Sequence, residues 1–138
     1  MFPVHGHHGE PADVFGRLRV LVVDDEPDMV KTLLELLGSE GYEARGQSSG
    51  EAALKALHDF LPDVVVSDIA MPGVNGWELA REIRQRMGKH PTLIAMTGRF
   101  TQDSAKVLAR ICGFDHYVLK STDPKVLLDL IGKATAEK

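Results

Sequence analysis

Short apolar runs alternate along the chain with longer segments in which apolar residues recur at helical spacing. The short runs are rich in valine, leucine and isoleucine, which is typical of strands buried on both faces of a sheet. The run that ends before Ser48 carries the weakest pattern. These runs predict strands at 19–24, 42–47, 64–67, 92–96 and 116–119.

The longer segments predict a helix after each strand. Pro27 suits the first turn of the first helix, and Ser48 or Ser49 can cap the second. Gly113 ends the fourth helix, and Asp123 can cap the last. The predicted helical ranges are 27–37, from the serine cap to about 59, 77–87, 102–111 and 124 to about 133.

This order of elements predicts an α/β fold. Because a helix crosses over between successive strands, the strands should be parallel and the sheet covered on both faces. Residues 18–138 are expected to form one domain, since a chain of 138 residues can bury its own core. Residues 1–17 contain prolines, glycines and closely spaced histidines, and are expected to be a flexible arm.

Polar residues stand where the predicted strands end. Asp24 and Asp25 close the first run, and Asp68 closes the third. The fourth strand leads into Thr97 and the fifth into Lys120. In a sheet of flavodoxin-like order 2-1-3-4-5, ligands bind at the carboxyl ends of the strands, between the first and the third. The sequence therefore predicts one site that contains carboxylates, a hydroxyl and an ammonium group.

A cluster of carboxylates needs a counter-charge. Two unit charges about 4 Å apart repel by roughly 4 kcal/mol at an effective dielectric of 20, so protons, a cation or a lysine must accompany the cluster. Carboxylate oxygens are ligands that Mg²⁺ prefers, and we expect Mg²⁺ here. A carboxylate can also attack phosphorus, and a metal, a lysine and a hydroxyl are the groups that stabilise phosphoryl transfer.

Each of these residues has a simpler interpretation when it is taken alone. Asp24 and Asp25 could cap the following helix or stay solvated. Thr97 alone would be a turn residue, and Tyr117 alone would be a half-buried aromatic of the sheet. The combination of residues at successive strand ends favours the functional interpretation.

Four segments together resemble the receiver domains of two-component response regulators. The resemblance covers nearly the whole chain outside the arm, and the order and spacing of the segments make the signal specific. It implies a flavodoxin-like (βα)5 doubly wound parallel sheet in a signalling phosphoacceptor, not a turnover enzyme. The segments are VLVVDDEPD at 20–28, VVVSDIAMPGVNGWEL at 64–79, IAMTG at 94–98 and HYVLK at 116–120.

The resemblance implies that Asp68 accepts a phosphoryl group from a phosphohistidine of a histidine kinase or phosphotransfer protein. Asp25 and Asp68 would bind Mg²⁺ directly, together with the backbone carbonyl of Ala70. Asp24 would act through a water molecule. The chain would thus take part in its own phosphorylation and dephosphorylation.

Further roles follow from the same resemblance. Lys120 would pair with Asp68 and then with the phosphoryl oxygens, and Thr97 would hydrogen-bond the acyl phosphate. Tyr117 matches an aromatic that swings inward as Thr97 moves, which is a two-state switch. The fourth helix, fifth strand and fifth helix would report the state to a downstream protein that the sequence does not identify. A phosphorylation-dependent dimer is one form that this response could take.

One residue departs from the family pattern. Ser121 stands where the family usually has a proline after the lysine, often in a cis bond. Because a cis bond before a non-proline residue costs roughly 2.5–4 kcal/mol, we expect a trans bond here. The path of the loop into the last helix, and the aim of Lys120, are therefore open.

The composition of the chain limits the classes of partner and the cellular compartment that are expected. The net charge of −4 and the pI of about 5.8 argue against nucleic acid or a membrane surface as a partner. Cys112 is the single cysteine, so no internal disulfide can form, and a cytoplasmic setting fits. No apolar run approaches the roughly 20 residues needed to span a bilayer.

Other functions stay open at this point. The chain could be a single-domain regulator or a receiver excised from a hybrid kinase. It could also be a binding module that lost phosphotransfer, which only the Lys120–Ser121 junction supports. A haloacid-dehalogenase-type phosphatase would need an acidic residue two positions after the nucleophile, where Ala70 stands. The acidic first loop would repel a flavin phosphate, and a flavin site rests on analogy of fold alone.

Overall fold

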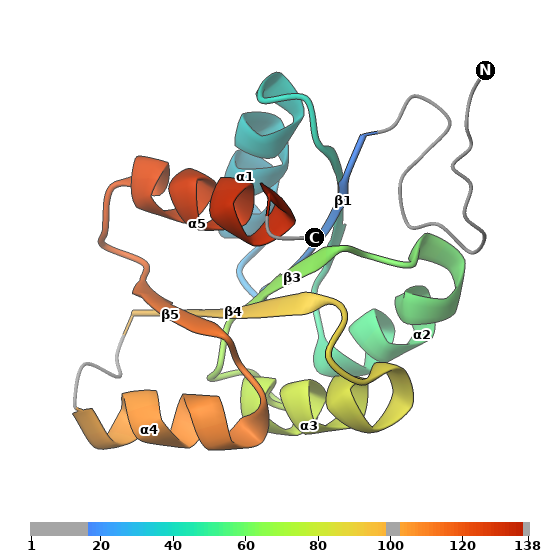
Figure 1. Ribbon diagram of the computed structural model, residues 1–138, viewed down its shortest axis with the longest axis vertical. Coiled ribbons are helices and arrows are strands. Elements are labelled where there is room, and N and C mark those ends of the chain that lie inside the picture. The colour runs from blue at the N-terminus through green and yellow to red at the C-terminus, as the bar shows by residue number, and fades with distance from the viewer. Residues whose placement is uncertain (1–16, 99–102, 137–138) are drawn as a thin grey trace.

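A computed structural model of the chain describes residues 17–98 and 103–136. In this part of the chain, strands and helices alternate strictly, and the strands form one parallel sheet of order β2-β1-β3-β4-β5 (Figure 1). The predicted α/β class, parallel pairing and strand order are therefore confirmed. The strands are β1 (Arg19–Val23), β2 (Glu43–Gln47), β3 (Val64–Ser67), β4 (Thr92–Thr97) and β5 (His116–Leu119). The helices are α1 (Pro27–Ser39), α2 (Gly50–Phe60), α3 (Gly76–Met87), α4 (Asp103–Cys112) and α5 (Pro124–Ala136).

Helices cover both faces of the sheet. Figure 1 shows α1 and α5 on one face, and α2, α3 and α4 on the other. Successive side chains of β1 point to opposite faces of the sheet. Leu21 and Val23 pack in the apolar cluster under α2 and α3. Val20 and Val22 pack in the apolar cluster under α1 and α5. Burying each such side chain stabilises the fold by about 1.5–3 kcal/mol. The strands carry continuous apolar runs because both of their faces are buried.

Side-chain caps fix where two of the helices begin. The Ser49 hydroxyl accepts a hydrogen bond from the Ala52 N–H at 3.1 Å, so α2 begins at the next residue, Gly50. The Asp123 carboxylate accepts one from the Lys125 N–H at 2.9 Å at the start of α5. Both predicted caps are confirmed, with Ser49 and not Ser48 in the first case.

The third helix begins one residue before the predicted position. Asn75 and Glu78 form a capping box, in which the Glu78 N–H donates to Asn75 Oδ1 at 3.0 Å and the Asn75 N–H donates to Glu78 Oε1 at 3.1 Å. This box places Gly76 inside the helix. The last helix runs to Ala136, past its predicted end, and the fourth ends at Cys112. Gln102, the predicted start of the fourth helix, lies outside the described residues.

Glycines let two helices press on the loop that follows β3. A Cβ added at Gly76 would meet the backbone carbonyl of Asp68 and lie 2.7 Å from the Ile69 Cα. A Cβ added at Gly50 would meet the carbonyl of Val74 in the same loop. The Gly76 N–H also donates to the Ile69 carbonyl at 2.9 Å. The backbone on either side of Asp68 is therefore held closely in place.

The predicted arm, residues 1–17, lies outside the described residues apart from Arg17, so its division from the domain stays a prediction. Within the described residues, no helix has the length and apolar character needed to cross a membrane.

Candidate functional site

The carboxyl ends of β1 and β3 bring three aspartates together. Val23 and Ser67 are paired in register on these neighbouring strands, so Asp24 and Asp68 follow side by side. The Asp68 N–H donates to the Val23 carbonyl at 2.8 Å. Carboxylate oxygens of Asp24, Asp25 and Asp68 all lie within 4.8 Å of one another. The convergence that the sequence predicted is therefore present.

The backbone orients the two buried carboxylates. Asp24 is fully buried and Asp68 is 5% exposed, whereas Asp25 is exposed. Asp24 Oδ1 accepts a hydrogen bond from the Glu26 N–H at 2.9 Å, and Asp68 Oδ1 accepts one from the Ile69 N–H at 2.8 Å. In each carboxylate the other oxygen, Oδ2, lies near Lys120.

Lys120 reaches this cluster from the end of β5. Its N–H donates to the Thr97 carbonyl at 2.8 Å, which ties the lysine to the end of β4. Its Nζ lies 2.9 Å from Asp24 Oδ2 and 3.3 Å from Asp68 Oδ2. Within the described residues the one cis peptide bond precedes Pro91, so the bond between Lys120 and Ser121 is trans, as expected. Lys120 points into the site although serine replaces the family's proline.

The same ammonium also contacts Glu26, which is not among the predicted site residues. Lys120 Nζ lies 2.6 Å from Glu26 Oε1, the shortest of its three carboxylate contacts. Glu26 is the third acidic residue in a row and stands directly before Pro27, at the N-cap position of α1. The run of three acidic residues at the end of the first strand could have identified Glu26 as a candidate site residue. The spacing does not indicate which side chain an exposed glutamate contacts.

These contacts shift the protonation equilibria of the site. Burial and the charge of Asp24 raise the pKa of Asp68 above its usual value, against the opposing pull of Lys120. Burial alone would lower the pKa of Lys120, but the surrounding Glu26, Asp24 and Asp68 raise it well above its usual value. The hydrogen bond and charge of Lys120 lower the pKa of Glu26. The lysine therefore stays charged at neutral pH.

The other predicted site residues lie around this cluster. Thr97 is 1% exposed and ends β4, and Ala70 is exposed two residues after Asp68. Tyr117 pairs in register with Ala95 on the neighbouring strand. Its phenol oxygen is buried and has no hydrogen-bond partner in the described part of the chain, and burial raises its pKa. The sheet therefore places Thr97 at the carboxyl end of β4 and Lys120 directly after β5, in contact with the carboxylates, and Tyr117 further back along β5.

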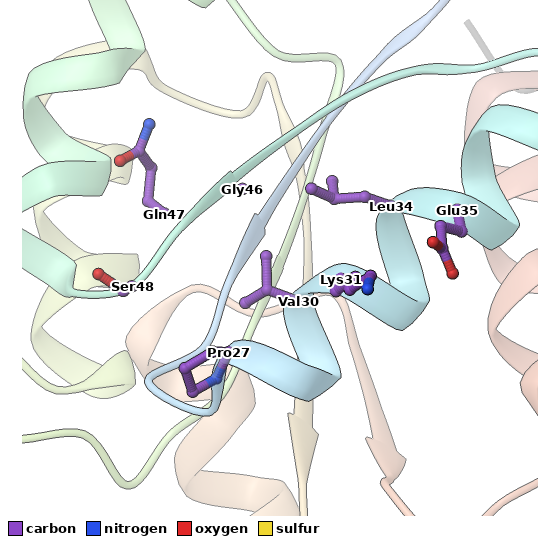
Figure 2. Close-up of a pocket in the computed structure, with 8 residues that line it drawn as sticks. All are labelled: Pro27, Val30, Lys31, Leu34, Glu35, Gly46, Gln47 and Ser48. Carbon is purple, nitrogen blue, oxygen red and sulfur yellow. The ribbon is translucent and has the colours of Figure 1, made fainter.

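A separate groove lies between α1 and the edge strand β2. Figure 2 shows Val30 and Leu34 on the side of α1 that faces β2, next to Gly46. A Cβ at Gly46 would collide with the Val30 side chain, so a larger residue at this position would require Val30 to shift. The groove begins at Pro27, just past the acidic loop, but none of the three aspartates lines it. The chemistry therefore lies outside the groove.

The residues present fit a hard divalent cation. Three aspartates offer oxygens at one place, with two of the carboxylates buried and oriented by backbone N–H groups. Oxygen is the ligand atom that Mg²⁺ requires, and its preference for retained waters suits a cluster with one exposed member. Among the described residues the cluster has one ammonium against four carboxylates, an excess of negative charge that a cation would neutralise.

Comparison with known proteins agrees with this geometry. The family model described as response regulator receiver domain matches residues 20–132. A response regulator receiver domain protein (CheY-like) from Methanospirillum hungatei JF-1 has a TM-score of 0.81 at 25% identity, over 88% of this chain and 95% of that one. The response regulator TrrA from Thermotoga maritima, solved in complex with Mg²⁺-BeF, has a TM-score of 0.76 at 36% identity, over 85% and 98% of the two chains.

Curated relatives share the same part of the chain. The DNA-binding response regulator MtrA from Mycolicibacterium smegmatis is 35% identical over 112 residues, which are 81% of this chain and 48% of MtrA. The chain spans about half the length of the first such relatives that it matches.

Proposed function

The chain belongs to the response regulator receiver domain family, and on that premise we propose that Asp68 is its phosphoacceptor. The observation that carries the proposal is the setting of the Asp68 carboxylate. It is nearly buried among two other aspartates, one oxygen is fixed by the Ile69 N–H, and the other lies 3.3 Å from the Lys120 ammonium. The donor is a phosphohistidine on a histidine kinase or a phosphotransfer protein.

The proposed reaction is an attack of the Asp68 carboxylate on phosphorus. A bond forms between a carboxylate oxygen and phosphorus as the phosphorus–nitrogen bond of phosphohistidine breaks. The imidazole leaves with the bonding electrons, and the product is an acyl phosphate. Burial and the charge of Asp24 raise the pKa of Asp68, which makes its carboxylate a stronger base and a better nucleophile than an ordinary surface aspartate.

The proposed ligands for Mg²⁺ are Asp25 and Asp68 directly, the backbone carbonyl of Ala70, and Asp24 through a water molecule. When bound, the cation neutralises the carboxylates and the phosphoryl oxygens, which otherwise repel one another. The clustering of the aspartate oxygens within 4.8 Å supports this assignment, as does the exposure of Asp25 and Ala70 at the mouth of the site.

Lys120 and Thr97 have proposed roles after transfer. The ammonium of Lys120 pairs with a phosphoryl oxygen, and the hydroxyl of Thr97 hydrogen-bonds the acyl phosphate. Tyr117 then changes its position as Thr97 moves. The absence of a hydrogen bond to the Tyr117 phenol, within the described residues, supports this role because no such bond holds the ring in one position.

The output surface in this proposal is formed by α4, β5 and α5. Large apolar side chains are exposed there: Val107 (59%), Ile111 (74%) and Val126 (41%). Exposed apolar side chains that gather on one face are typical of protein-binding surfaces. The occupant is a downstream protein or a second phosphorylated copy of this chain. The expectations of a cytoplasmic setting and of no nucleic-acid partner stay predictions.

The domain in this proposal is a signalling phosphoacceptor that turns over only its own phosphoryl group. A haloacid-dehalogenase-type phosphatase needs a second acidic residue where this chain has Ala70. The methyl group of Ala70 can neither donate nor accept a proton, so a steady hydrolysis of outside phosphoesters is not expected.

Phosphorylation by a small donor tests the proposal. The full chain is incubated with Mg²⁺ and phosphoramidate, and intact mass spectrometry should show the addition of one phosphoryl group. Asp68→Asn should stay unmodified, whereas the matched control Asp28→Asn, at an exposed acidic residue of α1, should be modified like the parent. An unmodified parent chain, or a modified Asp68→Asn variant, would overturn the proposal.

A further inference from the structure

Within the described part of the chain, the Lys120 ammonium is shared unequally among three carboxylates. It lies 2.6 Å from Glu26, 2.9 Å from Asp24 and 3.3 Å from Asp68. The contact with the proposed phosphoacceptor is therefore the longest of the three. A charge-assisted N–H···O bond is typically about 2.7–2.9 Å long, so the lysine is held by Glu26 and Asp24 more closely than by Asp68.

The three carboxylates differ in what happens to them when the lysine leaves. Asp24 is fully buried and the side chain of Asp68 is 7% exposed, so either would become a buried charge without its cation. The side chain of Glu26 is 63% exposed, and water can solvate it at once. Glu26 is thus the one member of this set that can release the ammonium at little cost.

The backbone of Glu26 is fixed while its side chain is exposed. Its N–H donates to Asp24 Oδ1 at 2.9 Å, and its carbonyl accepts a hydrogen bond from the Val30 N–H at 3.2 Å in the first turn of α1. The same Asp24 carboxylate contacts Lys120 through its other oxygen. The Asp24 carboxylate therefore binds both the Glu26 backbone and the Lys120 ammonium. Only the Glu26 side chain has to move to break the contact between Glu26 and Lys120.

From these contacts we propose that Glu26 is a positioning residue for Lys120. In the unphosphorylated protein its carboxylate holds the ammonium at 2.6 Å, closer than the 3.3 Å contact that the ammonium makes with Asp68. When Asp68 carries a phosphoryl group, the added negative oxygens draw the ammonium inward, and Glu26 passes into solvent. This inference rests on the proposed function, because it assigns the counter-ion that Lys120 exchanges when Asp68 is phosphorylated.

Amine labelling of Lys120 tests the proposal in the full chain. A brief pulse of an amine-reactive reagent is applied, and mass spectrometry gives the labelling rate of Lys120 relative to the exposed Lys55. Glu26→Gln should raise that ratio by about two- to fivefold in the resting protein, because an exposed ion pair of this kind is lost. Glu26→Asp, which keeps the charge on a shorter side chain, should restore part of the protection. Asp28→Asn, which removes a charge elsewhere in the first turn of α1, should leave the ratio unchanged.

A second measurement follows the release. With Mg²⁺ and beryllofluoride, a phosphoryl mimic, the parent and Glu26→Gln should label Lys120 at the same rate, since Glu26 no longer holds it. Equal labelling of the two resting proteins would overturn the inference, and so would a difference that persists unchanged although beryllofluoride alters the labelling rate of Lys120 in the parent. If beryllofluoride changes Lys120 labelling in neither protein, the proposed function fails, whereas the hold of Glu26 is still decided by the resting proteins.

Discussion

Arg84 on α3 joins Asp115, the residue before β5, at a distance of 2.7 Å between Nη2 and Oδ2. The same guanidinium donates to three backbone carbonyls, at 2.9 Å to Gly113, 3.0 Å to Gly88 and 2.7 Å to Pro91. The Asp115 carboxylate also accepts a hydrogen bond from the Leu93 N–H at 2.8 Å. One side chain thus connects the ends of α3 and α4 to the amino ends of β4 and β5, opposite the acidic site.

Arg84→Lys is expected to lower the free energy of unfolding by about 2 kcal/mol, because an ammonium cannot replace the planar fork that serves four acceptors. Urea denaturation followed by circular dichroism measures this change. Arg86→Lys on the same helix is the matched control, since Arg86 makes an exposed pair with Glu82 at 3.3 Å. It should change stability by less than about 0.5 kcal/mol. Equal effects of the two substitutions would contradict the role given to Arg84.

Gly76→Ala and Gly38→Ala should have opposite effects on stability. A Cβ at Gly76 meets the backbone of Asp68 and Ile69, so alanine there should cost about 2–3 kcal/mol. A Cβ at Gly38 has no atom within 4 Å, and this residue lies inside α1, so alanine should stabilise the protein by about 0.5–1 kcal/mol. Thermal unfolding of the two variants measures both changes. A stable Gly76→Ala variant would mean that the loop after Asp68 can shift.

Much of the fold can be predicted from the sequence because the strands are buried on both faces. Such strands appear as uninterrupted apolar runs, and their carboxyl ends appear as the polar residue that follows each run. Because β1 and β3 are parallel neighbours, Asp24, Asp25 and Asp68 are expected to lie together at the carboxyl ends of these strands, and they do. The pattern locates backbone positions well because burial acts on every residue of a strand.

Contacts between particular charged side chains could not be predicted in this way. Nothing in the spacing indicates that Lys120 contacts Glu26 as well as Asp24, or that Arg84 meets Asp115. Many charged residues lie on the surface, and the hydrophobic pattern carries no information about which two of them pair. The start of α3 is a different case, because the Asn75 and Glu78 capping box could have been recognised from the sequence.

Tyr117→Phe is expected to leave the resting protein as stable as the parent, or to stabilise it by up to about 1 kcal/mol. The phenol oxygen is buried and makes no hydrogen bond within the described residues, so its removal takes away a desolvation cost and no bond. The ring keeps its packing against the apolar cluster under α2, α3 and α4. Urea denaturation measures the change. A loss of more than about 1 kcal/mol would show that the phenol has a partner.

Asp68→Asn is expected to raise the free energy of unfolding at neutral pH without Mg²⁺, by about 1 kcal/mol. The substitution removes a carboxylate that is nearly buried beside Asp24 and keeps an oxygen for the Ile69 N–H. Asp28→Asn is the control: it removes an exposed charge from the first turn of α1 and should lower stability by a few tenths of a kcal/mol.

The advantage of Asp68→Asn over the parent should depend on pH and on Mg²⁺. Because the pKa of Asp68 is raised in the folded state, the folded parent binds more protons than the unfolded chain between the usual value of 3.8 and the raised one. The free energy of unfolding of the parent, relative to Asp68→Asn, therefore falls as pH rises through that window. Above the window the Asp68 carboxylate is ionised in the folded parent, and the difference in stability between the two proteins is at its largest. Mg²⁺ should stabilise the parent and not the variant, which narrows or reverses the difference at neutral pH. Urea denaturation of both proteins from pH 4 to 8, with and without Mg²⁺, measures this, and a difference that is independent of pH and Mg²⁺ would contradict the assignment of Asp68 to the metal site.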